Sequence, residues 1–440
     1  MTSAATMAPQ PTGEAPLTAA EPAEGTQGLR DTVGLWGNLG ISLLLPVAAA
    51  FVVLPGRPLG VTVLAIVVGA VIGGLLLGMT AAPAARERVP AMMLLRGLLG
   101  RRVSGLPTAL NIVQCIGWAT FEIVVIAESA SRALHTLRWP IVLAAGVLAT
   151  AMAVRPLGVM RVLARYAVWL ALAVTAYLFL RVLSHPSHQV TEGASSFWSA
   201  VDVVIALPVS WFPLAGDYTR HARTPRAALV GAATGYGLAT IGMFTLGVLA
   251  LAAYGTTGLD VIGSLLAVPL GVLALLLLVA VELDEVFANI YSTAISAQNF
   301  AGRVDRRGLA IIVGVVSTAL ALVVDVTSYE AFLFLIGAVF VPLAGVLVVA
   351  YYLVPRGAWD TSDRATGKPE YLLAWAAGFA AYQLTLPTYF DGTAGAWTHW
   401  WAERQADLHI SATNGLSASL VSLTVASILA AGLALARRRH

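Results

Sequence analysis

The hydrophobic segment at residues 105–134 carries three side chains at four-residue spacing: Gln114, Trp118 and Glu122. Residues four apart lie on one face of a helix, so the three should meet near the middle of this segment. Polar groups are expensive inside a bilayer and face a cavity or a partner. The face carrying Gln114 and Glu122 is therefore expected to line a polar site.

A second cluster lies in the segment 264–300, which holds Glu282, Asp284, Glu285 and Asn289 among apolar residues. Glu282, Glu285 and Asn289 share one helical face, and Asp284 points toward the neighbouring one. Three carboxylates within four residues cannot all be ionised and unpaired in lipid; they need a bound cation, a proton or a basic partner. No basic residue lies at matching depth, which favours an ion or proton role over a structural network with Arg.

The composition places both clusters in a membrane protein. Apolar residues make up 58% of the 440 positions and charged residues 11%, whereas soluble domains carry about 25% charged residues. The single cysteine, Cys115, excludes a disulfide framework and a cysteine-based metal site. The net charge of +3 does not indicate a nucleic-acid partner, because the basic residues lie at predicted membrane edges.

Apolar runs between turn signals predict an all-α polytopic protein with about twelve spans. They lie near residues 33–54, 59–80, 105–134, 139–154, 159–183, 197–217, 227–254, 264–300, 308–325, 329–354, 370–387 and 414–436. Residues 1–32, rich in Ala, Pro, Thr and Glu, are predicted to be a disordered cytoplasmic tail.

The positions of the basic residues predict the orientation. With the N-terminus inside, 21 of the 26 Lys and Arg residues fall in cytoplasmic segments, and the exceptions are Arg57, Arg132, Arg138, Arg181 and Arg404. The positive-inside rule therefore predicts a multi-pass protein of the cell membrane with both termini in the cytoplasm.

Internal symmetry indicates the class of membrane protein. The first span is interrupted by Gly, Asn and Pro in the run WGNLGISLLLP (36–46), and the sixth by Pro in PVSWFP (208–213). These interruptions are five spans apart, so the halves 33–183 and 197–354 would run in opposite directions, followed by the pair 370–436. Paired broken helices in inverted repeats indicate a secondary transporter with a site at the midplane; the simpler alternative is two ordinary proline kinks.

Four motifs in order along the chain resemble those of nucleobase–cation symporters, the purine–cytosine permeases. They are RVPAMMLLRGLLGRR (88–102), QCIGW (114–118), VDVVIALPVSWFPLAGDYTR (201–220) and NIYS (289–292). The resemblance runs from about residue 33 to 300, and it is the combination that is specific.

This resemblance implies a LeuT-type fold of five plus five helices with the first and sixth broken. It implies a planar nitrogen heterocycle as substrate, such as cytosine, a purine or hydroxymethylpyrimidine, and coupling to Na⁺ or H⁺ without another cofactor. Trp118 would stack on the ring and Asn289 would bond its polar edge, beside Gln114. The further candidates for the substrate site are Asn38, Glu122, Ser210 and Trp211, with Pro208 as an alternative stacking residue to Trp211.

The sequence departs from the family pattern at the expected cation site. Where sodium-coupled members carry small hydroxyl residues, this chain has Leu283 and Asp284. Asp284 is thus the candidate ligand for Na⁺, or the proton carrier in its place. The backbone around Gly40 and Leu43 is expected opposite it, and Glu282, Glu285 and Glu122 compete for the role.

Two other classes compete with this reading. An amino-acid permease of the same fold would need the broken-helix backbone but has less use for Trp118 and Asn289. An intramembrane enzyme could use the clustered acids, but no Asp-rich metal motif is present in the sequence. The particular heterocycle and the oligomeric state are not readable from the sequence.

Overall fold

In the apolar core of a bilayer the backbone must satisfy its own hydrogen bonds, so long apolar segments form helices. The computed structural model describes residues 23–156, 166–254, 260–325, 328–353, 359–389, 395–410 and 415–437. Within these ranges the chain is helical apart from turns, loops and one isolated bridge between Gln27 and Ala222.

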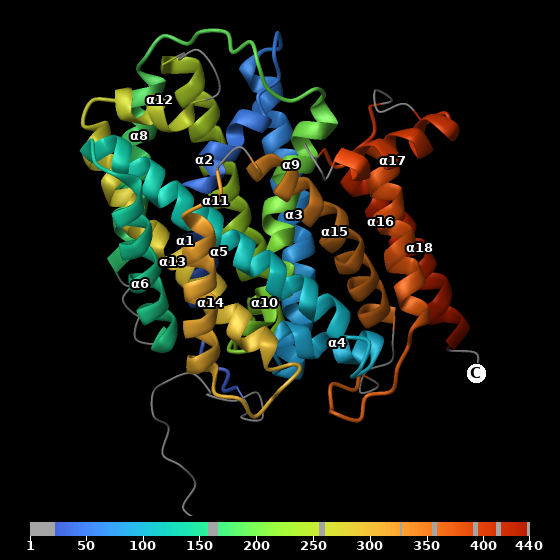
Figure 1. Ribbon diagram of the computed structural model, residues 1–440. Helices are drawn as coiled ribbons and strands as arrows, with labels where there is room; N and C mark the ends of the chain where they lie inside the picture. Colours follow the sequence, from blue (N-terminus) through green and yellow to red (C-terminus); the bar gives the residue numbers. More distant parts are fainter. Residues whose placement is uncertain are drawn as a thin grey trace, which may run out of the picture.

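The helices form an upright bundle (Figure 1). They are α1 (Leu29–Leu39), α2 (Leu44–Ala48) with a 3₁₀ turn (Ala49–Phe51), α3 (Leu59–Glu87), α4 (Ala91–Leu99), α5 (Gly105–Leu134), α6 (Arg138–Val154), α8 (Val168–Leu183), α9 (Phe197–Ser210), α10 (Phe212–Thr219), α11 (Pro225–Tyr254), α12 (Val261–Ala267), α13 (Gly271–Ala297), α14 (Arg306–Ala321), α15 (Tyr329–Leu353), α16 (Glu370–Thr385), α17 (Gly395–Asp407) and α18 (Ala418–Arg437). Each of the twelve predicted spans contains one of these helices or a pair of them, which confirms the all-helical polytopic prediction.

The first span is broken between α1 and α2, which meet at an angle of 56°. Gly40 ends α1 where a Cβ would lie 2.6 Å from the Cβ of Ala239, so only glycine allows this close approach to α11. Pro46 lies in the first turn of α2, where a missing N–H is tolerated. The four residues 40–43 therefore expose backbone groups inside the bundle.

The sixth span is also interrupted, but the chain bends less there than in the first span. Only Trp211 separates α9 from α10, and the pair reads as one apolar span, Phe197–Thr219. Pro213, in the first turn of α10, has no N–H to continue the α9 hydrogen-bond ladder. The predicted interruption is present, but it turns the chain far less than the one in the first span.

Several predicted boundaries differ from the structure. The span 264–300 is two helices, because Leu270 adopts a left-handed conformation (φ 57°) between α12 and α13. The end of the predicted tail is ordered: α1 begins at Leu29, and the backbone N–H groups of Thr26 and Gln27 donate to the carbonyl of His221. Residues 1–22, and the start of the span 159–183 up to residue 165, lie outside the described residues.

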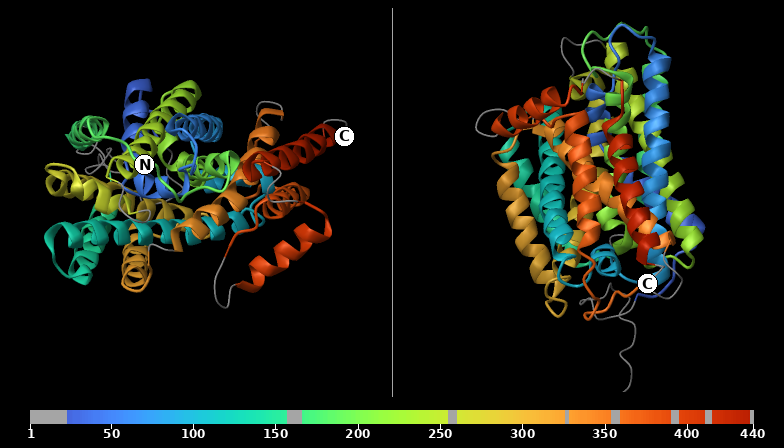
Figure 2. Two further views of the ribbon diagram at one scale, coloured as in Figure 1. Left: turned by 90° about the horizontal axis from the view of Figure 1, so that it is seen from above. Right: turned by 90° about the vertical axis from the view of Figure 1, so that its right-hand side faces the viewer.

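Close packing at small residues holds α3 between α9 and α11. A Cβ on Gly69 of α3 would lie 2.6 Å from Val204 of α9, and one on Gly78 would lie 2.6 Å from the carbonyl of Leu229 in α11. Small residues let membrane helices approach closely where no hydrophobic force drives them together. The helices α16, α17 and α18 lie together at one side of the bundle (Figure 2).

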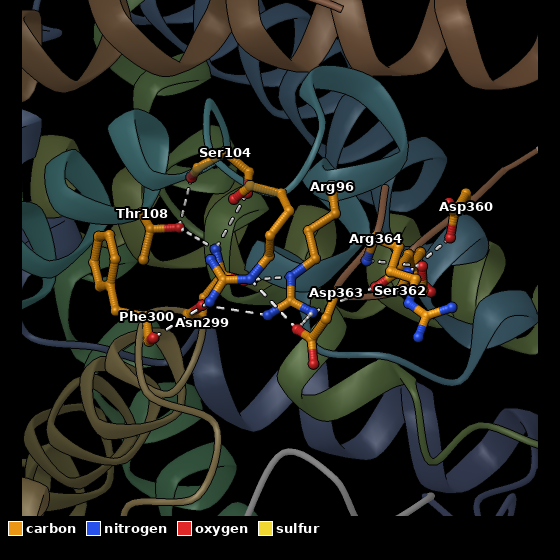
Figure 3. A network of polar contacts seen from close by, with 11 residues as sticks. Arg96, Ser104, Thr108, Asn299, Phe300, Asp360, Ser362, Asp363 and Arg364 are labelled. Atoms are coloured by element: carbon orange, nitrogen blue, oxygen red, sulfur yellow. Dashed lines mark hydrogen bonds and ion pairs between the residues drawn. The ribbon is translucent and has the colours of Figure 1, made fainter. Parts of the chain in front are cut away.

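A buried arginine fixes α4 to other segments at one end of the bundle (Figure 3). The Nε of Arg96 donates to Oδ1 of Asn299 (2.7 Å), just beyond α13, and its Nη1 to Asp363 (2.9 Å). The amide of Asn299 in turn donates to Thr108 of α5 (2.8 Å). Helices α4, α5 and α13 and the segment 359–369 are thus tied together at this end, called the α4 end below.

Candidate functional site

A small closed cavity lies where the two broken spans meet α5, α11 and α13. It has room for about one water molecule, about 10 Å³. Its walls are formed by Ser42, Leu44, Leu45, Trp118, Glu122, Leu207, Ser210, Trp211, Leu214, Tyr236, Glu285 and Asn289. One space is therefore surrounded by predicted site residues that lie far apart in the sequence: Trp118, Glu122, Ser210, Trp211, Glu285 and Asn289.

Two tryptophans supply aromatic surface to this cavity. Trp118 is 5% exposed and packs edge-on against Tyr329 (5.9 Å between ring centroids) and Phe332 (5.2 Å). Trp211 packs against Trp36 and Tyr236, at 5.8 and 5.9 Å. Contacts between aromatic rings at these distances are favourable, so both indoles are held in place beside the cavity.

Trp211 and Pro208, the two alternative stacking residues, lie in different surroundings. Trp211 lines the cavity, whereas the ring of Pro208 lies against α3, with its Cγ 3.0 Å from where a Cβ on Gly73 would be. Pro208 therefore packs helix against helix, and Trp211 is the aromatic residue of the sixth span that faces the cavity.

Asn289 is joined to the acids around it. Its Nδ2 donates to Oε1 of Glu122 (2.9 Å) and to the backbone carbonyl of Glu285 (3.2 Å). The second oxygen of Glu122 and the Oε1 of Glu285 are buried and have no hydrogen-bond partner among the described residues. The face predicted to join Glu285 with Asn289 is present and meets α5 through Glu122.

Gln114 and Ser210 use their polar groups to bond to other parts of the protein near the cavity. The Nε2 of Gln114 donates to Asn111 and to the backbone carbonyl of Ser210 (both 2.9 Å), and Gln114 is absent from the cavity walls. Ser210 does line the cavity, but its hydroxyl donates to the carbonyl of Leu207 (2.6 Å). Gln114 thus holds the end of α9 in place, and the structure does not place it against the cavity.

At the break of the first span the structure reverses the expected order of the acids. Glu282, and not Asp284, lies opposite the break: it accepts from the backbone N–H of Leu43 (2.6 Å) and from the hydroxyl of Ser42 (2.8 Å). Asp284 accepts from the amide of Asn38, at the end of α1. Residue 282 is two positions before 284 on the α13 helix, so the two acids point in different directions and reach different parts of the first span.

Four buried acids therefore share the centre of the bundle: Glu122, Glu282, Asp284 and Glu285, each 3% exposed or less. None of the ion pairs among the described residues involves them. Nor do three His, Cys, Asp or Glu side chains of the described part of the chain converge to hold one metal ion. A cation at Asp284 would thus need Asn38 and backbone oxygens as its other ligands.

A second cavity, of about 840 Å³, lies at the end of the bundle opposite α4, near the start of α15 and the end of α16. Phe51, Phe121 and Phe332 are among its walls. Phe332 also contacts Trp118 of the central cavity, and Phe121 contacts Tyr329 (5.4 Å). The contact between Trp118 and Phe332 thus joins a wall of the central cavity to a wall of the second one.

Sequence reasoning missed Tyr236 of α11 as a wall of the central cavity. Its hydroxyl faces the region of Trp211 and Glu285. The surrounding sequence, TGYGLAT (234–240), reads as an ordinary small-residue helix, and no signal in it distinguishes this tyrosine. Only the packing of α11 against α1 brings it to the site.

A family model described as a permease for cytosine/purines, uracil, thiamine and allantoin matches residues 20–372. No curated protein matches the chain. The family match spans both broken helices, the first three residues of α16 and everything between them, and it includes every residue of the central cavity.

Solved structures give the same fold. Mhp1, a nucleobase-cation-symport-1 family transporter, in a closed conformation with bromovinylhydantoin bound, has 17% identity and a TM-score of 0.73, covering 97% of this chain and 95% of that one. Its inward-facing conformation has a TM-score of 0.70, with 17% identity and coverage of 99% and 95%. A Na⁺-coupled sialic acid symporter has 10% identity, coverage of 95% and 90%, and a TM-score of 0.61. At these identities the likeness establishes the fold, and it confirms the expected architecture with broken first and sixth helices.

Proposed function

The chain belongs to the family of permeases for cytosine/purines, uracil, thiamine and allantoin, and we propose that it carries a nucleobase or a related nitrogen heterocycle into the cell, coupled to a cation or a proton. The observation that carries this proposal is the central cavity, where Trp118 and Trp211 meet Asn289 and Glu122 between the two interrupted spans. Aromatic faces suit stacking on a planar ring, and carboxyl and carboxamide groups suit its polar edge.

Entry and exit follow from the arrangement of the two cavities. The α4 end is proposed to face the cytoplasm, since most basic residues lie there, and the larger cavity would face outside. The central cavity is smaller than a ring substrate, so Trp118, Trp211 and the start of α15 must shift to admit one. The two predicted repeats, 33–183 and 197–354, would then move relative to each other in alternating access.

We assign the coupling ion to Asp284. Its Oδ1 and the Oδ1 of Asn38 are both buried without a hydrogen-bond partner among the described residues, so two oxygens near the end of α1 are available to an ion or a proton. Glu282 already accepts two hydrogen bonds at the break, which makes it the anchor of that break. Hard cations such as Na⁺ prefer oxygen ligands, and a proton on Asp284 would serve equally.

The experiment compares Asp284→Asn with wild type in proteoliposomes. An ion gradient drives accumulation only if the ion binds the loaded transporter better than the empty one. The variant is therefore expected to lose gradient-driven uptake of labelled base while keeping counterflow, which needs no gradient. Dissipating the Na⁺ and pH gradients separately in wild type identifies the ion.

The control is Asp305→Asn, an exposed acid that caps α14 through the N–H of Arg307, where Asn caps equally well. It should leave both activities unchanged. If Asp284→Asn still concentrates the base as wild type does, the coupling site lies elsewhere. If amino acids and not bases compete for uptake, the amino-acid permease alternative is correct.

A further inference from the structure

The polar atoms around the central cavity are mostly acceptors. Oε2 of Glu122 and Oε1 of Glu285 are buried carboxyl oxygens with no hydrogen-bond partner in the described part of the chain. Both side chains line the cavity and are 2% and 3% exposed. Buried carboxyl oxygens are costly to leave unpaired, so these two atoms indicate donors on whatever occupies the cavity.

The orientation of Asn289 adds a third acceptor. Its Nδ2 lies between the carboxyl of Glu122 and the backbone carbonyl of Glu285, and a backbone carbonyl has no proton to give to an amide oxygen. The network therefore fixes which end of the amide is nitrogen. The Oδ1 of Asn289 is the end left for a bound molecule, and an amide oxygen only accepts.

The hydroxyl groups in the cavity walls do not change this excess of acceptors over donors. The hydroxyl of Ser42 donates a hydrogen bond to Glu282 (2.8 Å), and the hydroxyl of Ser210 donates one to the carbonyl of Leu207 (2.6 Å). The indole N–H of Trp211 is already used by the hydroxyl of Tyr236. Among the lining side chains this leaves two donors, the Nε1 of Trp118, which is unpaired within the described residues, and the hydroxyl of Tyr236. Two carboxyls and an amide oxygen offer several more acceptor positions than these two groups offer protons.

The charge of the site also favours a bound molecule that supplies hydrogen-bond donors. Four acids lie at the centre, and no Lys, Arg or His is among the residues that line the cavity. Burying unpaired negative charge is strongly unfavourable. A bound molecule that brings its own proton or positive charge would relieve it, whereas one that brings carbonyl oxygens would add to the repulsion.

From these contacts, and resting on the proposed function above, we infer that the substrate is an amino-substituted base with an amidine edge, a ring nitrogen beside an exocyclic NH₂, and that Glu122 and Glu285 select it. When the ring nitrogen of an amidine edge takes the proton, the carboxylate accepts two parallel hydrogen bonds, one from the ring N–H and one from the NH₂. A ring edge with carbonyls on both sides of an N–H gives the same carboxylate one hydrogen bond and places carbonyl oxygen against carboxylate oxygen.

The test measures binding of three matched pairs to the purified full chain: cytosine against uracil, adenine against hypoxanthine, and guanine against xanthine. The members of each pair differ where an amino group replaces a carbonyl oxygen. The amino member is expected to bind more tightly by about tenfold or more in at least one pair, the loss expected when a buried polar group is left unpaired. Glu122→Gln, which presents a donor in place of one acceptor, should reduce that preference.

The matched control is Glu128→Gln on the same helix, an acid absent from the cavity walls, which should keep the wild-type preference. Uracil, hypoxanthine and xanthine binding as tightly as their partners in wild type would overturn the inference and leave the proposed function intact. Binding of none of the six would also overturn the inference, and the proposed function would then be decided by the same assay with related nitrogen heterocycles. The comparison of the three pairs in wild type needs no variant, so it tests the inference even if Glu122→Gln misfolds. In that case Glu285→Gln provides the second test of whether these carboxyls recognise the amino group. An unchanged preference for the amino-substituted bases in Glu285→Gln would also count against the inference.

Discussion

Replacing Trp118 with Ala tests the central feature of the site, an indole that lines the cavity and makes edge contacts with Tyr329 and Phe332. A base stacked on an aromatic side chain gains about 1–3 kcal/mol. Since about 1.4 kcal/mol corresponds to tenfold in affinity, the dissociation constant of a transported base should rise by about five- to 150-fold.

The same substitution also removes buried packing. Trp118 is 5% exposed, and deleting a buried Trp side chain costs about 3–5 kcal/mol of folding free energy. Loss of binding must therefore be separated from loss of fold. The assay measures affinity in detergent only for samples whose thermal transition lies well above the assay temperature, and Trp118→Phe is included because it keeps an aromatic face.

The control is Trp169→Ala on α8, a tryptophan that is 69% exposed on the surface of the bundle. It should keep wild-type affinity. Trp118→Phe should retain most of the binding that Trp118→Ala loses. If Trp118→Ala folds and keeps wild-type affinity for every base that wild type binds, Trp118 does not stack on the substrate.

Three further predictions follow from other contacts. Asn289→Ala leaves a carboxyl of Glu122 without its donor, so it should weaken some ring substituents more than others, by about five- to 100-fold; a uniform loss across an analogue series would contradict edge recognition. Arg96→Ala leaves Asn299 without its guanidinium partner and should lower the free energy of unfolding by about 2–4 kcal/mol. Asp363→Ala should lower it by about 1 kcal/mol or less, because the Asp363 side chain is 82% exposed. Equal losses would show that Arg96 acts only through Asp363. Burial, with Arg220 nearby, lowers the pKa of His221 from 6.5 to about 4. As the pH falls, the unfolded chain therefore binds a proton at this residue first, and the contribution of His221 to stability, full above pH about 6.5, should fall as the pH drops toward about 4. The melting temperature of His221→Gln should lack that part of the pH dependence, and identical profiles for variant and wild type would contradict the assignment.

The sequence alone determined the class of molecule and the helices that carry its chemistry. Apolar runs of about 20 residues have only one way to satisfy their backbone in lipid, so the spans could be located without a structure. Four-residue spacing on a helix fixes a face, which is why Trp118 and Glu122 on one span, and Glu285 and Asn289 on another, could be named as candidate site residues. The order of the motifs indicated the family.

Tertiary structure decided which of these side chains meet. Gln114 lies on the predicted face yet bonds to the end of α9, and Tyr236 enters the site from a helix with no polar signal. That Glu282 bonds to the first break, while Asp284 bonds to Asn38, depends on the depth at which α13 passes α1. Helical periodicity gives the direction of a side chain around its own axis, but the rotation and depth of one helix against another come from packing at small residues and from long-range hydrogen bonds, which no local pattern contains.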